Sequence, residues 1–179
     1  NSPRRRELLA GLDIDYRVTA LPEVDESYPD TLSGEEIPLY ISQEKAAAYR
    51  RFMKDNTLLI TADTIVWLDG KVYGKPHDIA DAKAMLQALS GKTHTVITGV
   101  TLTSLQKQIS FAVSTEVTFA ALGDDEIDYY VETYRPLDKA GAYGVQEWIG
   151  YIGVTGLKGS YYNVMGLPIQ RLYTELKKF

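Results

Sequence analysis

The chain has 179 residues, 45% of them hydrophobic, which suits one domain with a sizeable core. Its net charge of −5 disfavours nucleic-acid polymers as partners, and no apolar run is long enough to span a membrane. Cysteine is absent, and His77 and His94 are the only histidines, which excludes disulfides and multi-histidine zinc sites. A bound metal is therefore expected to be magnesium or manganese, held by oxygen atoms. The lack of cysteine also fits a cytoplasmic location.

A helix is predicted at the start of the chain. Ser2 is a good N-cap and Pro3 a favoured first helical residue. Arg4, Arg5 and Arg6 then fall in the first turn, where the helix dipole disfavours each cation by about 0.3–1 kcal/mol. Either these arginines bind an anion such as a phosphate, or they pair with the chain's own carboxylates or face solvent. Because the chain starts at this cap, with no initiator methionine or preceding strand, we expect it to be truncated or processed.

Strand and helix patterns follow one another without a regular strand–helix–strand order. Strands are predicted at 16–19, 57–62, 65–68, 71–73, 93–103, 109–121, 148–155 and 160–164. Helices are predicted over 41–52, from Asp78 to a stop at Gly91, from Asp124 to Pro136, and from Pro168 through Leu176. The pair Asp69-Gly70 predicts a tight hairpin, and 93–103 with 109–121 a long antiparallel pair. We expect residues 1–179 to form one mixed α/β domain with a partly antiparallel sheet.

Asp63 is the first candidate for catalysis. It is expected at the carboxyl end of the strand 57–62, where open α/β sheets place ligands, and Thr64 follows it. A carboxylate there can activate water or hold a metal, although a strand-end aspartate more often caps a turn. The acidic segment around Glu26 could supply a second carboxylate for magnesium, although acidic loops are usually just solvated.

Two lysines and one loop are further candidates. Lys45 in the expected helix and Lys75 on a rigid Gly-Lys-Pro turn could meet a phosphate, although such lysines usually face solvent. The segment 136–146 combines two glycines and an Asp–Lys pair with Tyr143 and Gln146, which is typical either of a functional loop or of a packed turn with Tyr143 in the core. Together these features indicate that the ligand is a nucleotide phosphate ester with a divalent metal.

Six segments, in this order, resemble the Maf family of nucleoside triphosphate pyrophosphatases, and the resemblance covers essentially the whole chain. They are Ser2-Pro3-Arg4-Arg5, Ala62-Asp63-Thr64, Gly74-Lys75-Pro76, residues 85–100 with Leu89-Ser90-Gly91 and Thr98-Gly99-Val100, Asp138 through Gln146, and Val164 through Pro168. The resemblance implies the fold of the inosine triphosphate pyrophosphatases, with a cleft between two lobes. It also implies hydrolysis between the α- and β-phosphates to a nucleoside monophosphate and pyrophosphate, and a homodimer.

The resemblance also implies roles for individual residues. Asp63 is the catalytic general base, and Asp63 and Glu26 are the metal ligands. The residues that bind the nucleoside triphosphate are Ser2, Arg4, Arg5, Lys45, Thr64, Lys75 and Gln146. Arg4, Thr64 and Gln146 match the positions that separate the dTTP and UTP branch from the 7-methylguanosine triphosphate branch, and the chain resembles the former.

The chain departs from the family pattern in two places. A strand ending in Ala-Ser, with a phosphate-binding serine, precedes the arginine segment in the family and is missing here. Gln146 is usually followed by glycine, whereas this chain has Glu147-Trp148, so the base pocket can differ in detail. The alternatives to a pyrimidine nucleotide pyrophosphatase are an enzyme that prefers purine or 7-methylguanosine triphosphates, and a non-catalytic nucleotide-binding regulator of cell division.

Overall fold

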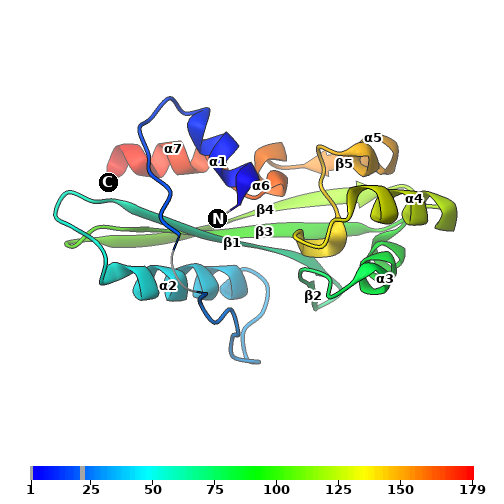
Figure 1. Ribbon diagram of the computed structural model, residues 1–179, viewed down its shortest axis with the longest axis horizontal. Coiled ribbons are helices and arrows are strands. Elements are labelled where there is room, and N and C mark those ends of the chain that lie inside the picture. Colours follow the sequence, from blue (N-terminus) through cyan, green and yellow to red (C-terminus); the bar gives the residue numbers. More distant parts are fainter. Residues whose placement is uncertain (1, 21–22) are drawn as a thin grey trace. The chain divides into compact units, whose positions relative to one another are not determined.

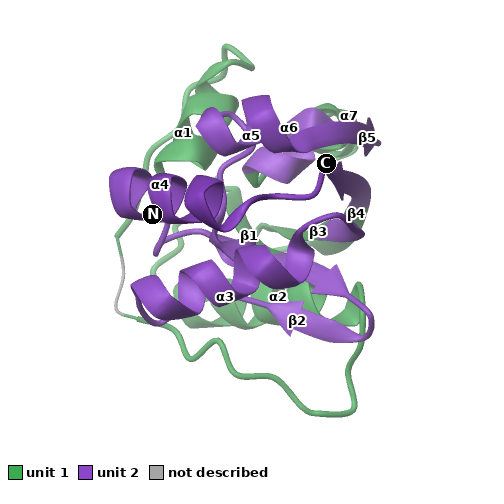
Figure 2. Cartoon of the chain, turned by 90° about the vertical axis from the view of Figure 1, so that its right-hand side faces the viewer, with its two compact units in different colours: residues 1–64, 97–113, 166–179 green, residues 65–96, 114–165 purple. Residues whose placement is uncertain are grey.

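The computed structural model describes residues 2–20 and 23–179, and the chain divides into two compact units. Figure 2 shows unit 1 in green, with residues 1–64, 97–113 and 166–179, and unit 2 in purple, with residues 65–96 and 114–165. One domain over residues 1–179 stays a prediction.

One five-stranded sheet is present within the described residues, with the strand order β2-β1-β3-β4-β5. β1 pairs antiparallel with β2, and β4 with β5. β3 and β4 are neighbours joined by a tight turn, closed by the Ser104 N–H that donates to the Lys107 carbonyl at 2.8 Å, which requires an antiparallel pair. The predicted mixed α/β class is therefore confirmed. The strands are β1 (Leu59–Leu68), β2 (Lys71–Tyr73), β3 (Thr93–Thr103), β4 (Gln108–Phe119) and β5 (Val154–Lys158).

Unit 1 combines parts of β1, β3 and β4 with α1 (Pro3–Ala10), α2 (Glu36–Arg50) and α7 (Ile169–Lys178). In Figure 1, α2 lies on one face of these strands and α1 and α7 on the other. The contact of α2 with β3 includes a buried hydrogen bond of 2.8 Å between the hydroxyls of Ser42 and Thr101. Ile37, Ile41 and Ala46 form the apolar side of α2 and are almost completely buried, so α2 is fixed against the sheet by one face.

Unit 2 holds the remaining strand segments and the other helices. α3 packs against α4 and the short η1. His94, Phe119 and Tyr143 form an aromatic cluster with ring centroids 4.9 to 5.4 Å apart. Tyr143 is therefore in the core, as the packed-turn interpretation of segment 136–146 predicted. The helices are α3 (Ile79–Leu89), α4 (Asp124–Tyr134), η1 (Ala140–Ala142), α5 (Trp148–Gly153) and α6 (Tyr161–Met165).

Several local predictions are confirmed. The Ser2 side chain accepts a hydrogen bond from the Arg5 backbone N–H at 3.3 Å, so Ser2 is the N-cap of α1. Asp69 and Gly70 both have positive φ between β1 and β2, as a type I′ hairpin requires. Asp78 caps α3 through the Asp81 N–H, and Pro168 stands at the start of α7.

The predicted strands 148–155 and 160–164 are wrong, because both segments begin as helices, α5 and α6. Gly150 lets α5 approach the preceding loop, since a side chain there would come within 1.8 Å of the Val145 carbonyl oxygen. α6 begins after Ser160, whose hydroxyl accepts the Asn163 N–H at 3.2 Å, a capping signal that the aromatic residues masked. These local contacts thus outweigh the strand propensity of the apolar residues.

Three other boundaries differ from the prediction. Residues 16–19 form no strand; Tyr16 and Val18 are exposed, and an isolated strand has little to stabilise it. The predicted helix 41–52 spans Glu36–Arg50 instead, since proline is tolerated in a first turn. The strand predicted to end before Asp63 continues to Leu68, so Asp63 lies within β1 rather than at its end.

Candidate active site

Alternation along β1 separates the two polar residues Asp63 and Thr64. Neighbouring residues of a strand point to opposite faces of the sheet, and residues two apart share a face. Thr61 donates a hydrogen bond of 2.8 Å to the Ser42 carbonyl of α2, and Asp63 lies on the same face as Thr61. Thr64 contacts Arg5 of α1 instead. Asp63 therefore belongs to the side of α2, and Thr64 to the side of α1.

Asp63, Lys45 and Glu26 form a charged cluster in unit 1. The Lys45 ammonium lies 3.4 Å from Asp63 Oδ1 and 3.1 Å from Glu26 Oε1. It also donates to the Ala62 carbonyl at 3.1 Å. The Lys45 side chain is only 16% exposed, so the interpretation of a solvent-facing lysine is wrong. The structure thus brings together three residues that are 18 and 19 positions apart along the chain.

Asp63 is held in an unusual state for a carboxylate. The residue is 9% exposed, and its Oδ2 is buried without a hydrogen-bond partner among residues 2–20 and 23–179. Burial raises the pKa of Asp63, while the positive charges of Lys45 and Arg5 oppose that shift. A buried carboxylate with one oxygen on an ammonium and one oxygen unsatisfied is suited to accept a proton or to hold a cation.

Arg5 and Thr64 form a second polar group. Arg5 donates from Nε to the Gly166 carbonyl at 2.7 Å and from Nη2 to the Thr64 hydroxyl at 3.0 Å. The Thr64 hydroxyl is also 2.8 Å from the Thr98 hydroxyl on β3. Burial lowers the pKa of Arg5, and the charge of Asp63 opposes this shift. Arg5 therefore neither pairs directly with a carboxylate of the described chain nor faces solvent. Its hydrogen bonds join α1 to β1 and to the segment before α7.

The other predicted site residues are Ser2, Arg4, Lys75 and Gln146. Arg4 and Ser2 are partly exposed at the start of α1. Lys75 and Gln146 belong to unit 2, where Lys75 is exposed and Gln146 is partly buried. The turn of Lys75 and the loop of Gln146 are joined by one backbone hydrogen bond, from the Gly141 N–H to the Gly74 carbonyl at 3.1 Å. The Gln146 Oε1 is buried and has no hydrogen-bond partner in the described part of the chain.

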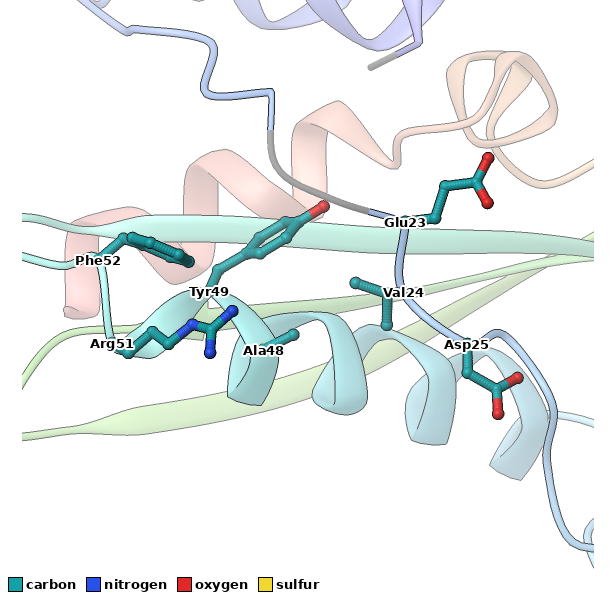
Figure 3. A pocket seen from close by; sticks show the side chains of 7 residues that line it. All are labelled: Glu23, Val24, Asp25, Ala48, Tyr49, Arg51 and Phe52. Carbon is teal, nitrogen blue, oxygen red and sulfur yellow. The ribbon is translucent and has the colours of Figure 1, made fainter.

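A surface pocket of about 240 Å³ lies elsewhere in unit 1, between the acidic segment and the C-terminal half of α2. Figure 3 shows that the carboxylates of Glu23 and Asp25 point away from the Arg51 guanidinium across this pocket. Asp63 and Lys45 do not line it. The pocket is thus distinct from the charged cluster of Asp63, Lys45 and Glu26.

The sequence did not predict two residues that contact the polar group of Arg5 and Thr64. Thr98 and Gly166 both fall in segments that resemble the Maf family, but a threonine or a glycine by itself does not indicate a functional role. Their contribution is to bind Thr64 and Arg5, which the sequence alone could not place. The sequence feature that could have pointed to them is that both residues lie within the segments that resemble the family.

Comparison with known proteins identifies the family. The family model described as Maf-like protein matches residues 1–179. The chain belongs to the Maf-like family. A Phocaeicola vulgatus protein named dTTP/UTP pyrophosphatase is 68% identical over 178 residues, which are 99% of this chain and 92% of that relative. Proteins of the same name from Parabacteroides distasonis and Flavobacterium psychrophilum are 59% and 48% identical, over 100% and 98% of this chain and 93% and 89% of theirs.

Two kinds of feature are absent from the described part of this Maf-like chain. In residues 2–20 and 23–179, no helix is both long and apolar enough to cross a membrane. The same residues hold no group of three or more histidine, cysteine, aspartate or glutamate side chains that could surround a metal ion.

Proposed function

We propose that this Maf-like chain hydrolyses dTTP, UTP and modified pyrimidine nucleoside triphosphates to the monophosphate and pyrophosphate. The relatives named dTTP/UTP pyrophosphatase support the substrate class. The observation that carries the chemistry is the buried Asp63, with Oδ1 on Lys45 and Oδ2 without a partner in the described chain. That arrangement fits a general base better than a stabilising ion pair, since a purely structural carboxylate would satisfy both oxygens.

In this proposal Asp63 Oδ2 takes a proton from a water molecule that attacks the α-phosphorus. The bond from that phosphorus to the bridging oxygen breaks, and pyrophosphate leaves with the electron pair. Lys45 orients Asp63 through Oδ1, and its charge favours the ionised carboxylate that the reaction needs. Ser2, Arg4, Arg5, Thr64 and Lys75 contribute the substrate contacts that the family resemblance implies.

The residues of the charged cluster fit a divalent cation. Asp63 and Glu26 offer carboxylate oxygens, the donor type that magnesium and manganese prefer. A bound cation would neutralise charge on the triphosphate. A homodimer, a cytoplasmic location and a cleft between two lobes stay predictions from the resemblance.

The test is the product formed from a panel of triphosphates with magnesium. We expect pyrophosphate and the monophosphate from dTTP and UTP, with lower catalytic efficiency for GTP and 7-methylguanosine triphosphate. Release of orthophosphate instead would mean a different bond is cut, and a purine preference would favour the other branch. Tight nucleotide binding without any pyrophosphate would favour a regulatory protein.

A further inference from the structure

The loop of Gln146 is fastened on both sides of that residue by one hydroxyl. Tyr130 of α4 is completely buried, and its oxygen accepts the Gly144 backbone N–H at 3.0 Å. The same hydroxyl donates to Glu147 Oε1 at 2.8 Å. Gln146 therefore stands between two residues that share a single anchor. We call the Tyr130 hydroxyl with its contacts to Gly144 and Glu147 the Tyr130 bridge.

The Tyr130 bridge is tightly packed and keeps its proton. Burial raises the pKa of Tyr130, so the hydroxyl stays a donor throughout the neutral pH range. A side chain at Gly144 would come 2.5 Å from Glu147 Oε1, so this carboxylate occupies the space that glycine leaves. Lys139 Nζ lies 3.8 Å from the same oxygen and offsets its charge. The loop backbone thus has a defined position around Gln146.

Gln146 itself is the residue of this loop with unused hydrogen-bonding capacity. Its Oε1 is buried and without a partner in the described chain, although an amide can both donate and accept. An unsatisfied buried amide oxygen costs free energy, and a fixed backbone is needed to keep it directed at a ligand. The departure Glu147, where the family usually has glycine, supplies the second end of the Tyr130 bridge.

We propose that Tyr130 and Glu147 are positioning residues that fix the Gln146 amide for base selection. The inference rests on the proposed function, because it assigns Gln146 to the base of the nucleotide. Neither Tyr130 nor Glu147 has to touch the substrate in this role. Their effect is on selectivity: a loosened loop lets the amide turn away, and the preference for the imide edge of uracil and thymine weakens.

The first test compares Tyr130→Phe with Tyr134→Phe. Tyr134 is the matched control because it is on the same helix and its ring stacks on Tyr130 at 5.1 Å. We expect Tyr130→Phe, which removes both hydrogen bonds of the Tyr130 bridge, to lower the UTP over GTP ratio of kcat/KM by about three- to tenfold. Tyr134→Phe should leave the ratio unchanged. Equal losses for both nucleotides in Tyr130→Phe would overturn the proposal.

The second test uses Glu147, so that the positioning role of the Tyr130 bridge can be tested even if Tyr130→Phe folds poorly. Glu147→Gln keeps an acceptor for the Tyr130 hydroxyl, whereas Glu147→Ala removes it. The ratio should fall in Glu147→Ala and recover largely in Glu147→Gln. Equal ratios in these two variants would overturn the positioning role of Glu147.

Hydrogen exchange separates this inference from the proposed function. In Tyr130→Phe the Gly144 N–H loses its acceptor, so the segment 143–148 should exchange faster than in Tyr134→Phe. If the unmodified protein releases no pyrophosphate from any nucleotide, the proposed function fails while the exchange result still reports on the bridge. Unchanged exchange in Tyr130→Phe would overturn the bridge itself.

Discussion

Asp63 in unit 1 and Gln146 in unit 2 each keep one buried oxygen without a hydrogen-bond partner in the described residues, but their surroundings differ. Asp63 lies beside the ammonium of Lys45 and near a second carboxylate, Glu26. Gln146 lies in a loop held by the Tyr130 hydroxyl, which accepts the Gly144 backbone N–H and donates to the Glu147 carboxylate. An ammonium and a second carboxylate near an unsatisfied carboxylate oxygen favour proton transfer or metal binding, whereas a fixed loop around an unsatisfied amide favours selection by shape and hydrogen bonding.

The largest expected effect comes from Asp63→Asn, which removes the Asp63 carboxylate from the charged cluster. We expect turnover to fall about 100- to 10,000-fold, because the variant cannot accept a proton. The pKa of Asp63 is raised in the folded state, so its ionisation costs stability as pH rises from about 4 through the folded pKa. At neutral pH the melting temperature should therefore hold or rise. Retained turnover in the purified variant would remove Asp63 from catalysis.

The pH dependence of protein stability tests whether His94 is buried as a neutral side chain in the core of unit 2. Burial lowers the pKa of His94 from 6.5 to about 4. Between these values the unfolded chain takes up a proton and the folded chain does not, so stability falls as pH drops through this range, by about 3 kcal/mol in total.

The measurement compares His94→Gln with the unmodified protein. The glutamine amide can donate to or accept from the Tyr143 hydroxyl, which lies 2.6 Å from His94 Nε2. Denaturant unfolding at pH 7 and pH 4.5 should show a smaller loss in the variant. The same loss in both proteins would mean that His94 titrates normally in the fold.

A smaller effect is expected from Arg5→Ala, which tests whether the arginines of α1 are equivalent. The change removes the hydrogen bonds to Gly166 and Thr64, so we expect a loss of about 1–2 kcal/mol after partial relief of the helix dipole. Arg6 is the control, because its side chain is exposed in the same turn. Thermal unfolding without nucleotide should be earlier for Arg5→Ala and unchanged or later for Arg6→Ala. Equal melting temperatures would mean that the Arg5 contacts add no stability.

Local signals predicted much of the fold. The cap at Ser2, the hairpin at Asp69-Gly70 and the cap at Asp78 depend on neighbours within a few residues, and all three are confirmed. The strands predicted at α5 and α6 are wrong, although the approach of Gly150 to Val145 and the cap at Ser160 are also local, because the surrounding aromatic and β-branched residues favour strands. Apolar aromatic segments of this length do not reveal such contacts.

The sequence offered candidate residues for the site but did not predict which of them lie together. Asp63, Lys45 and Glu26 were separate candidates, each with a plain structural interpretation. They lie together because one particular face of α2 packs against one particular face of β1. This packing involves segments that are distant along the chain, so the sequence did not reveal it. The separation of Thr64 from Asp63 follows from strand alternation, but only once β1 is known to continue past Asp63.

The most direct measurement of the central claim is kcat/KM for UTP and for GTP in two variants, Asp63→Asn and Gln146→Ala. The account predicts that Asp63→Asn lowers both values by the same factor and leaves their ratio unchanged. Gln146→Ala should lower the ratio by about tenfold or more, because the imide edge of uracil loses its partner. Parallel losses for both nucleotides in Gln146→Ala, or a changed ratio in Asp63→Asn, would contradict this division between chemistry and base selection.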